Sequence, residues 1–323
     1  MRTPSSLLAE RWQPTAVVVR RAALAALVMS VVIVVTGGAV RLTASGLGCT
    51  TWPRCTGESL TPTPAMGLHG IIEFTNRMLT YVLCAAIGWA ILAARCGRPW
   101  RRGLTRLGWA QFWLVMSNAV IGGITVLTGL NPYTVAVHLI SAMALVWVAL
   151  LMWERSKEGD GPPRPVVARP IVQLSYVLVA VVGLLVAAGT LVTGAGHHPG
   201  TPTDNKIVPR IPLDYDRLAQ AHADLAFVSV GLVIAVIFVF AAVKAPPAAR
   251  ARVRELFVVL LAQGVLGFVQ YFTDVPEILV GLHMFGATLT WIAVLRVPLA
   301  LRVRADEPAA PLPAQAPAEA VAA

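Results

Sequence analysis

Apolar residues run along this chain in eight nearly continuous segments, separated by short polar or glycine- and proline-rich breaks. At about 1.5 Å per residue, such segments are long enough to cross a hydrocarbon layer of about 30 Å as helices. The pattern therefore predicts an all-α integral membrane protein with eight transmembrane helices. The expected spans are roughly 20–40, 67–92, 107–129, 133–153, 171–193, 218–243, 256–272 and 278–300.

A unit of helix, proline break and helix occurs twice, because the stretch 118–143 recurs at 263–288. The matched pairs are Asn118 with Gln263, Gly122 with Gly267 and His138 with His283. Similarity at such a long period indicates a duplicated unit, and the functional sites of membrane proteins often lie between or within repeats. We therefore expect two pseudo-symmetric four-helix bundles.

The breaks between apolar segments also suggest domain boundaries. We expect a cytoplasmic N-terminal segment over 1–21, a first bundle over 22–153, a linker over 154–170, a second bundle over 171–300 and a disordered cytoplasmic tail over 301–323. The linker is charged and proline-rich, and the tail is Pro/Ala low-complexity sequence that cannot bury a core. No convincing cleavage site follows the first apolar segment, so we expect it to be retained as a helix.

Composition supports the membrane interpretation. The chain is 57% hydrophobic and 13% charged, and its mean hydropathy of +0.71 lies outside the range of soluble domains. Of its 26 Lys and Arg residues, 20 fall on one side of the expected helices. Because positive residues collect on the cytoplasmic side of a membrane, we expect a multi-pass protein of the plasma membrane with both termini in the cytoplasm. The net charge of +10 then faces anionic lipid, and no basic motif with interleaved aromatic residues supports nucleic-acid binding.

Two of the four cysteines, Cys49 and Cys55, lie in the first expected external loop. On the oxidising side of a membrane a disulfide can form and persist, which favours a disulfide over free or redox-cycling thiols. Cys84 and Cys96 lie in or beside the second apolar segment, where cysteine behaves as a small apolar residue.

Three histidines occupy a similar depth, since His138, His222 and His283 each follow an expected external helix start by five to seven residues. An ionisable residue inside a membrane helix indicates function, although a neutral histidine bonded to a backbone carbonyl is the structural alternative. Zinc needs more ligands, and none stands three or four residues from these histidines. A haem iron needs two axial ligands, and a four-helix bundle can hold a flat ring, so His222 and His283 are a candidate pair.

Glycines on the third and seventh expected helices are consistent with either helix packing or room for a flat ring. They are Gly122, Gly123, Gly264 and Gly267.

The sequence GLHGIIEFTNR at 67–77 places His69, Glu73 and Asn76 on one helical face. Arg77 follows Glu73 by four residues and can pair with it. A carboxylate in the membrane beside a haem could move protons or stabilise a developing positive charge. A structural Glu73–Arg77 pair is the alternative, and Arg77 could equally hold a haem propionate.

These motifs resemble the haem A synthase family. The resemblance rests on IIEFTNR after a loop containing SGLGC and WPRC, on VTGGAVRLT at the end of the first helix, and on lone histidines in the fourth, sixth and eighth helices. It covers the chain to about residue 300 and implies two four-helix bundles. The implied activity is that of a membrane haem-dependent oxidoreductase, which oxidises the methyl group at position 8 of haem O to a formyl group through hydroxylated intermediates. The product serves cytochrome oxidase.

The resemblance also implies roles for residues. Haem b would be the cofactor, held by His222 and His283 in the second bundle, and the substrate haem would lie in the first bundle beside His138. The family's catalytic glutamate falls on Glu73 and its loop cysteine pair on Cys49 and Cys55. The implied partners are haem O, membrane lipid, haem O synthase and assembly factors of cytochrome oxidase.

One position departs from the family pattern, because Asn76 stands where the family has a histidine. Two alternatives follow for the substrate iron opposite His138. His69 is the second ligand only if its helix begins near Pro64 and the haem lies close to the external surface. Otherwise the iron is five-coordinate, and Asn76 offers a hydrogen bond above an open face.

Two other functions are consistent with parts of this pattern. A b-type di-haem cytochrome that only transfers electrons would use the histidines but has no need for Glu73. A transporter would use the repeats but has no need for matched lone histidines.

Overall fold

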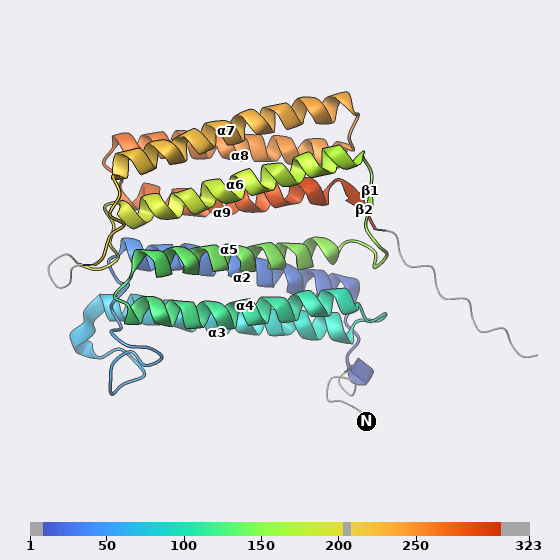
Figure 1. The fold of residues 1–323 in the computed structure, drawn as a ribbon. Helices are drawn as coiled ribbons and strands as arrows, with labels where there is room; N and C mark the ends of the chain where they lie inside the picture. Colours follow the sequence, from blue (N-terminus) through green and yellow to red (C-terminus); the bar gives the residue numbers. More distant parts are fainter. Residues whose placement is uncertain (1–8, 203–207, 305–323) are drawn as a thin grey trace, which may run out of the picture.

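The computed structural model describes residues 9–202 and 208–304 of the chain. This described part contains eight helices that are long and apolar enough to cross a membrane (Figure 1). They are α2 (Ala16–Leu42), α3 (Gly67–Cys96), α4 (Arg102–Leu127), α5 (Pro132–Arg155), α6 (Arg169–Ala195), α7 (Tyr215–Ala242), α8 (Pro247–Phe272) and α9 (Glu277–Leu299). The prediction of an all-α integral membrane protein with eight spans is confirmed.

The start of α8 differs from the expected span, because the helix begins at Pro247 and not near residue 256. Proline is well suited to the first position of a helix, and the stretch that follows is rich in Ala, Arg and Glu, which favour helix. Hydropathy alone missed this turn because its polar residues interrupt the apolar segment. Buried Ala249 and Val253 show that the extension packs against the rest of the protein.

The helices pack in two sets of four, α2–α5 and α6–α9, and in each set the first helix contacts the last. The two sets meet along a seam where α2 and α5 lie against α6 and α9 (Figure 1). Across this seam the indole nitrogen of Trp291 in α9 donates to the backbone carbonyl of Met143 in α5 at 3.0 Å. The seam is therefore held by a specific hydrogen bond as well as by apolar contact.

The two ends of the protein differ. One end, called the loop end below, carries the segments 43–63, 196–202 and 208–214 and the short 3-10 helix η1 (Pro64–Met66). The first two of these segments touch there, since the Gly46 amide donates to the Gly200 carbonyl at 2.7 Å. The opposite end, called the linker end, carries the segment 156–168 and both ends of the described chain (Figure 1).

The linker is tied to the segment that follows α9. Strand β1 (Arg164–Pro165) pairs antiparallel with β2 (Arg302–Val303), and Glu158 forms an ion pair with Arg304 at 3.3 Å. The expected tail over 301–323 thus begins with two residues in a strand. Residues 1–8, 203–207 and 305–323 lie outside the described residues, including most of that tail.

The buried apolar clusters lie mainly in the half of each set nearer the linker end. One cluster lies within α2–α5 and includes Ala90 and Leu104. The other includes Phe240 and Val253 of the second set and extends across the seam to residues of α2 and α5, such as Val146. Burial of such side chains is the main stabilising contribution to helix packing within a set. The histidines of α5, α7 and α9 lie beyond these clusters, towards the loop end.

Candidate functional site

Three histidines of matched depth share an unusual environment. His138 on α5, His222 on α7 and His283 on α9 are half-buried, and the Nδ1 atom of each is buried without a hydrogen-bond partner. The His222 ring also has the backbone carbonyl of Leu185 beside it. Buried polar atoms are rarely left unpaired, so each of these histidines is a candidate to bind a ligand.

Each of these histidines packs on a glycine of the preceding helix, and a side chain at that glycine would meet the imidazole ring. The pairs, with the distance from an added Cβ to the histidine Cε1, are Gly122 with His138 at 3.1 Å, Gly189 with His222 at 3.2 Å and Gly267 with His283 at 3.4 Å. The glycines therefore set how closely each ring approaches its neighbouring helix. The same device occurs three times in the eight-helix fold.

His222 and His283 face one another within the second set of helices. Their ring centroids lie 6.4 Å apart and the ring planes make an angle of 73°. An imidazole nitrogen binds a transition metal at about 2 Å, so two imidazoles on opposite sides of one ion have ring centres separated by roughly 6 Å. The pair thus fits two axial ligands of one haem iron, one from α7 and one from α9.

The first set of helices contains His138 and a second unpaired group, the Oδ1 atom of Asn76 on α3, which is also buried without a partner. His69, also on α3, is placed differently. Its side chain is exposed and its Nδ1 atom lies 3.0 Å from the Ser45 hydroxyl in the segment after α2. The helix does begin close to Pro64, as the ligand role of His69 requires, yet the ring is engaged with the loop end.

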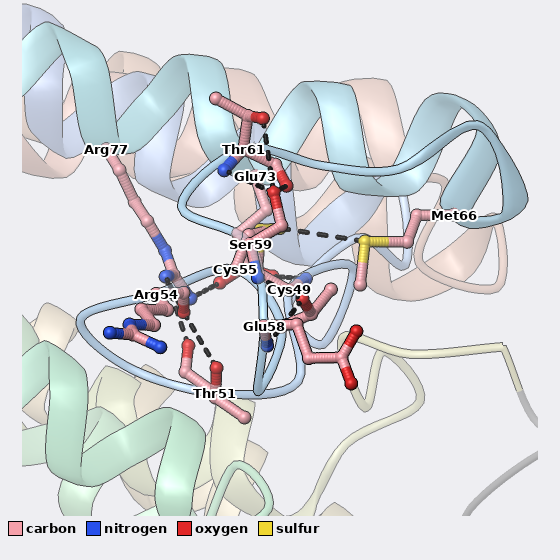
Figure 2. Close-up of a disulfide and its surroundings, with 11 residues drawn as sticks. Cys49, Thr51, Arg54, Cys55, Glu58, Ser59, Thr61, Met66, Glu73 and Arg77 are labelled. Carbon is pink, nitrogen blue, oxygen red and sulfur yellow. Dashed lines mark hydrogen bonds and ion pairs between the residues drawn. A yellow bond between two sulfur atoms is a disulfide. The ribbon is translucent and has the colours of Figure 1, made fainter.

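Glu73 is enclosed between its own helix and the disulfide loop, residues 49–55 (Figure 2). The residue is only 5% exposed. Its Oε2 atom accepts a hydrogen bond from the Cys49 amide at 2.6 Å, and its Oε1 atom forms an ion pair with Arg77 at 2.5 Å. Charge-assisted hydrogen bonds of this kind favour the carboxylate anion.

Arg77 extends the same network into the loop. Its Nη1 atom donates to the carbonyls of Thr51 at 3.1 Å and Arg54 at 3.3 Å. The loop is closed by the disulfide between Cys49 and Cys55, which confirms the predicted pairing (Figure 2). Of the other two cysteines, Cys84 is half-buried and Cys96 is buried, and both are free thiols.

The disulfide loop also reaches the helix that carries Gly122. The ring of Trp52 lies against Gly123 of α4, where a Cβ would come within 2.5 Å of it. Gly123 therefore makes room for Trp52, whereas Gly264 faces open space. Neither the Trp52 contact nor the role of Gly189 could be predicted from the sequence, because both depend on neighbours distant in sequence.

The remaining two histidines lie in the second long loop. His198 Nε2 is 2.8 Å from the Val275 carbonyl, and the His197 ring lies edge-on to Tyr215 with centroids 4.9 Å apart. Both have protein partners.

One family model matches most of the chain. The model of the cytochrome oxidase assembly protein family (COX15-CtaA) matches residues 20–295. The Heme A synthase of Lysinibacillus sphaericus is 32% identical over 151 residues, which are 43% of this chain and 46% of that protein. The Heme A synthase of Staphylococcus haemolyticus is 23% identical over 263 residues, covering 78% of this chain and 85% of that protein.

A relative with another name is also similar along most of this chain. The Protoheme IX farnesyltransferase of Thermus thermophilus is 28% identical over 293 residues, which are 82% of this chain but 45% of that protein. The chain thus spans about half the length of this relative, as it does for the L. sphaericus protein.

Proposed function

Because the chain belongs to the cytochrome oxidase assembly protein family, whose model matches residues 20–295, we propose that it is a haem A synthase. The proposed reaction oxidises the methyl group at position 8 of haem O to a formyl group, in which one oxygen atom, balanced as water, replaces two hydrogens and four electrons pass to an external electron acceptor. Two relatives that carry the name Heme A synthase support this reaction. The observation that carries the proposal is the facing pair of His222 and His283, with ring centroids 6.4 Å apart.

Haem b is the proposed cofactor of the second set of helices, with His222 and His283 as its axial ligands. When bound there, haem b would supply a one-electron relay. The chain's own contribution is to place the imidazoles of His222 and His283 where both could hold the group, and Gly189 and Gly267 let each ring lie close against the neighbouring helix. Fixed imidazole positions favour a low-spin iron that exchanges electrons without changing its ligands.

Haem O is the proposed substrate and would lie in the first set of helices, with His138 binding its iron from one side. On the other side of the iron, the geometry favours the alternative in which Asn76 offers a hydrogen bond above an open face over the alternative in which His69 is the second ligand. The Asn76 Oδ1 atom is buried and unpaired, whereas the His69 ring is exposed and engaged with Ser45. An open face above Asn76 would leave room at the iron for chemistry that a second imidazole would block.

Glu73 is the proposed catalytic residue. Its carboxyl group is held by Arg77 and the Cys49 amide, within the set of helices that contains His138. An anion at that place would stabilise positive charge that develops as the methyl group is oxidised, or accept the proton that the carbon loses. In this proposal the Glu73–Arg77 pair orients the carboxylate and Arg77 anchors it to the disulfide loop.

We also propose that the protein lies in the plasma membrane with both termini in the cytoplasm. The linker end carries most of the Lys and Arg residues, as the positive-inside rule requires for a cytoplasmic side. The disulfide then lies on the outer side, where it persists. The T. thermophilus relative is named for protohaem IX farnesyl transfer, which supports the enzyme that makes haem O as a partner.

Extraction of haems from cells tests the proposal. The full chain is expressed in bacteria that make haem O but lack their own haem A synthase, and the haems are separated by chromatography. We expect haem A in the cells and haem b on the purified protein by pyridine haemochrome spectroscopy. Haem b without haem A would instead support a b-type cytochrome, and a protein free of haem would contradict both functions.

A further inference from the structure

Two arginines meet at the loop end of the seam between the helix sets. Arg41 lies in the last turn of α2, and Arg210 lies in the segment before α7. Each guanidinium donates to the same acceptor, the Thr193 carbonyl, at 3.0 Å, and Arg210 also donates to the Gly196 carbonyl. Among the described residues, no Asp or Glu forms an ion pair with either arginine.

Capping of α6 accounts for part of this arrangement. Thr193 and Gly196 lie at the C-terminal end of α6, where carbonyls lack partners in the helix and a cation is favourable. One guanidinium with five N–H groups would suffice for these carbonyls. The second brings a like charge into a partly buried place, and burial lowers the pKa of Arg210.

Arg41 also has bonding capacity that the cap does not use. Its Nε atom is buried and has no hydrogen-bond partner. Arg41 lines a cavity between α2, α6, α7, α8 and α9, together with Thr193, Tyr215, Gln270 and Met284. Arg210 does not line the cavity itself, but it binds the carbonyl of Thr193, which does. A cavity lined by Arg41, with a second arginine behind Thr193 and no carboxylate in its described lining, is suited to an anion.

The cavity lies directly towards the loop end from the facing histidines. Tyr215 precedes His222 by seven residues, which places it on the same helical face about 10 Å along the axis. Gln270 follows Gly267, on which His283 packs, by about one turn. A flat ring with its iron between the two histidines would therefore extend one edge into this cavity.

We propose that Arg41 and Arg210 bind the propionate carboxylates of the porphyrin whose iron is held by His222 and His283. This inference rests on the proposed function, since it assigns the polar edge of the same haem. Arginine matches a carboxylate through paired N–H groups, and two arginines match the two propionates of one porphyrin. The carboxylates would supply the negative charge that the pair of cations lacks.

A free anion has the same chemistry, so the test must separate a propionate from inorganic phosphate or a lipid phosphate. The full-length protein is stripped of haem and titrated with haem b and with haem b dimethyl ester, which keeps the ring but has no carboxylates. The variants are R41Q/R210Q and the single R210Q, which changes only the loop residue. The control is R217Q, an exposed arginine of α7 at the same end.

Wild type and R217Q should bind haem b about tenfold or more tightly than the ester, as expected for lost charge-assisted hydrogen bonds. In R41Q/R210Q the two dissociation constants should become nearly equal, and R210Q should lie between. The midpoint potential of the bound haem b should fall in the double variant, because nearby positive charge favours the ferrous form. The potential reports on the haem without any turnover.

If wild type, R210Q and R41Q/R210Q all show the same ratio between the dissociation constants of haem b and its dimethyl ester, the propionate assignment is overturned. The bis-histidine haem would be unaffected by that result. Binding of inorganic phosphate or of phosphatidylglycerol vesicles to haem-free wild type, lost in R41Q/R210Q and not displaced by haem b, would also overturn it and assign the site to a free anion. A wild type without a bis-histidine spectrum would overturn the proposed function itself.

Discussion

At the scale of single residues, the clearest evidence for a ligand site comes from His222 and His283. Their rings face one another, and their Nδ1 atoms have no hydrogen-bond partners. Keeping two unpaired imidazoles half-buried costs free energy unless a ligand completes their bonding. His198 differs from His283, because its Nε2 atom lies 2.8 Å from the Val275 carbonyl. This contrast within one protein supports a ligand role for the pair.

Replacing either member of the pair should remove the bound haem. We expect His222→Ala and His283→Ala to lose the low-spin haem b signal, with haem content at most about a tenth of wild type, because each removes one of two axial ligands. Electron paramagnetic resonance and the haemochrome spectrum of purified protein measure this. Gln220→Ala on the exposed face of α7 is the control. A normal bis-histidine spectrum in both histidine variants would refute the assignment.

Glu73 should matter for turnover more than for folding. Glu73→Gln keeps size and hydrogen bonding to the Cys49 amide but removes the charge that pairs with Arg77. We expect near-normal protein and haem b levels, with haem A production reduced about a hundredfold, as for loss of general acid–base catalysis. The control is Glu58→Gln, at an exposed position in the segment that follows the disulfide loop. Wild-type haem A levels in Glu73→Gln would return the residue to a structural ion pair.

The sequence could predict the histidines, because depth from a helix start follows directly from the apolar pattern. It also predicted that Glu73 and Arg77 can pair, since a spacing of four residues places both on one helical face. It could not choose between His69 and Asn76. That choice depends on where Ser45 lies, and the path of a loop is not encoded in a local pattern.

At the scale of elements, the glycines explain how three helices present histidines to their neighbours. Gly122 and Gly267 were expected either to pack helices or to make room for a ring, and the structure shows each beneath a histidine ring. Gly189 has the same role for His222. The role of Gly189 was not predicted, because α6 and α7 are joined by a long segment. The other two glycine–histidine pairs lie on helices joined by short turns, α4 with α5 and α8 with α9, where the repeat is easy to recognise.

Two glycines of α8, one turn apart, allow a matched test of this packing. Gly267→Val should push the His283 ring away, since even a Cβ would lie 3.4 Å from its Cε1. We expect low-spin haem b to fall at least about fivefold, which corresponds to about 1 kcal/mol of strain in a packed site. Gly264→Val, which faces open space, should keep the signal. Equal haem content in the two variants would contradict the packing role.

The disulfide loop is the element that positions the carboxylate of Glu73, the proposed catalytic residue. Replacing Cys49 and Cys55 with Ser should free the loop, so that the Cys49 amide no longer holds Glu73. We expect haem A production to fall about tenfold while haem b content is unchanged, because a small misplacement of a catalytic group has a large effect on rate. Cys84→Ser, a free half-buried thiol, is the control. Loss of haem b together with haem A would indicate a general structural role.

At the scale of the whole molecule, eight spans follow from hydropathy because each apolar segment is set by the thickness of the bilayer. The pairing of β1 with β2 and the contact between Gly46 and Gly200 were not predictable in the same way. Both join segments far apart in sequence through a few backbone bonds, which leave no periodic pattern. The early start of α8 was missed for a different reason, since the polar residues of its first turns interrupt the apolar pattern from which the spans were predicted.

The arrangement of two helix sets suggests a division of roles between them. The second set holds the facing pair His222 and His283, and the first holds His138, Asn76 and Glu73. In the proposed function the second set binds the cofactor and the first binds and oxidises the substrate. The seam between α2, α5, α6 and α9 fixes the distance between the two sites.

Conversion of haem O by the purified full-length protein tests this central claim most directly. The protein, loaded with haem b, is supplied with haem O and a redox partner in detergent, and the extracted haems are analysed by mass spectrometry. The account predicts a product in which one oxygen has replaced two hydrogens of a methyl group, formed by wild type and not by Glu73→Gln, with haem b retained in both. Unchanged haem O in the presence of a normal bis-histidine haem b would contradict it.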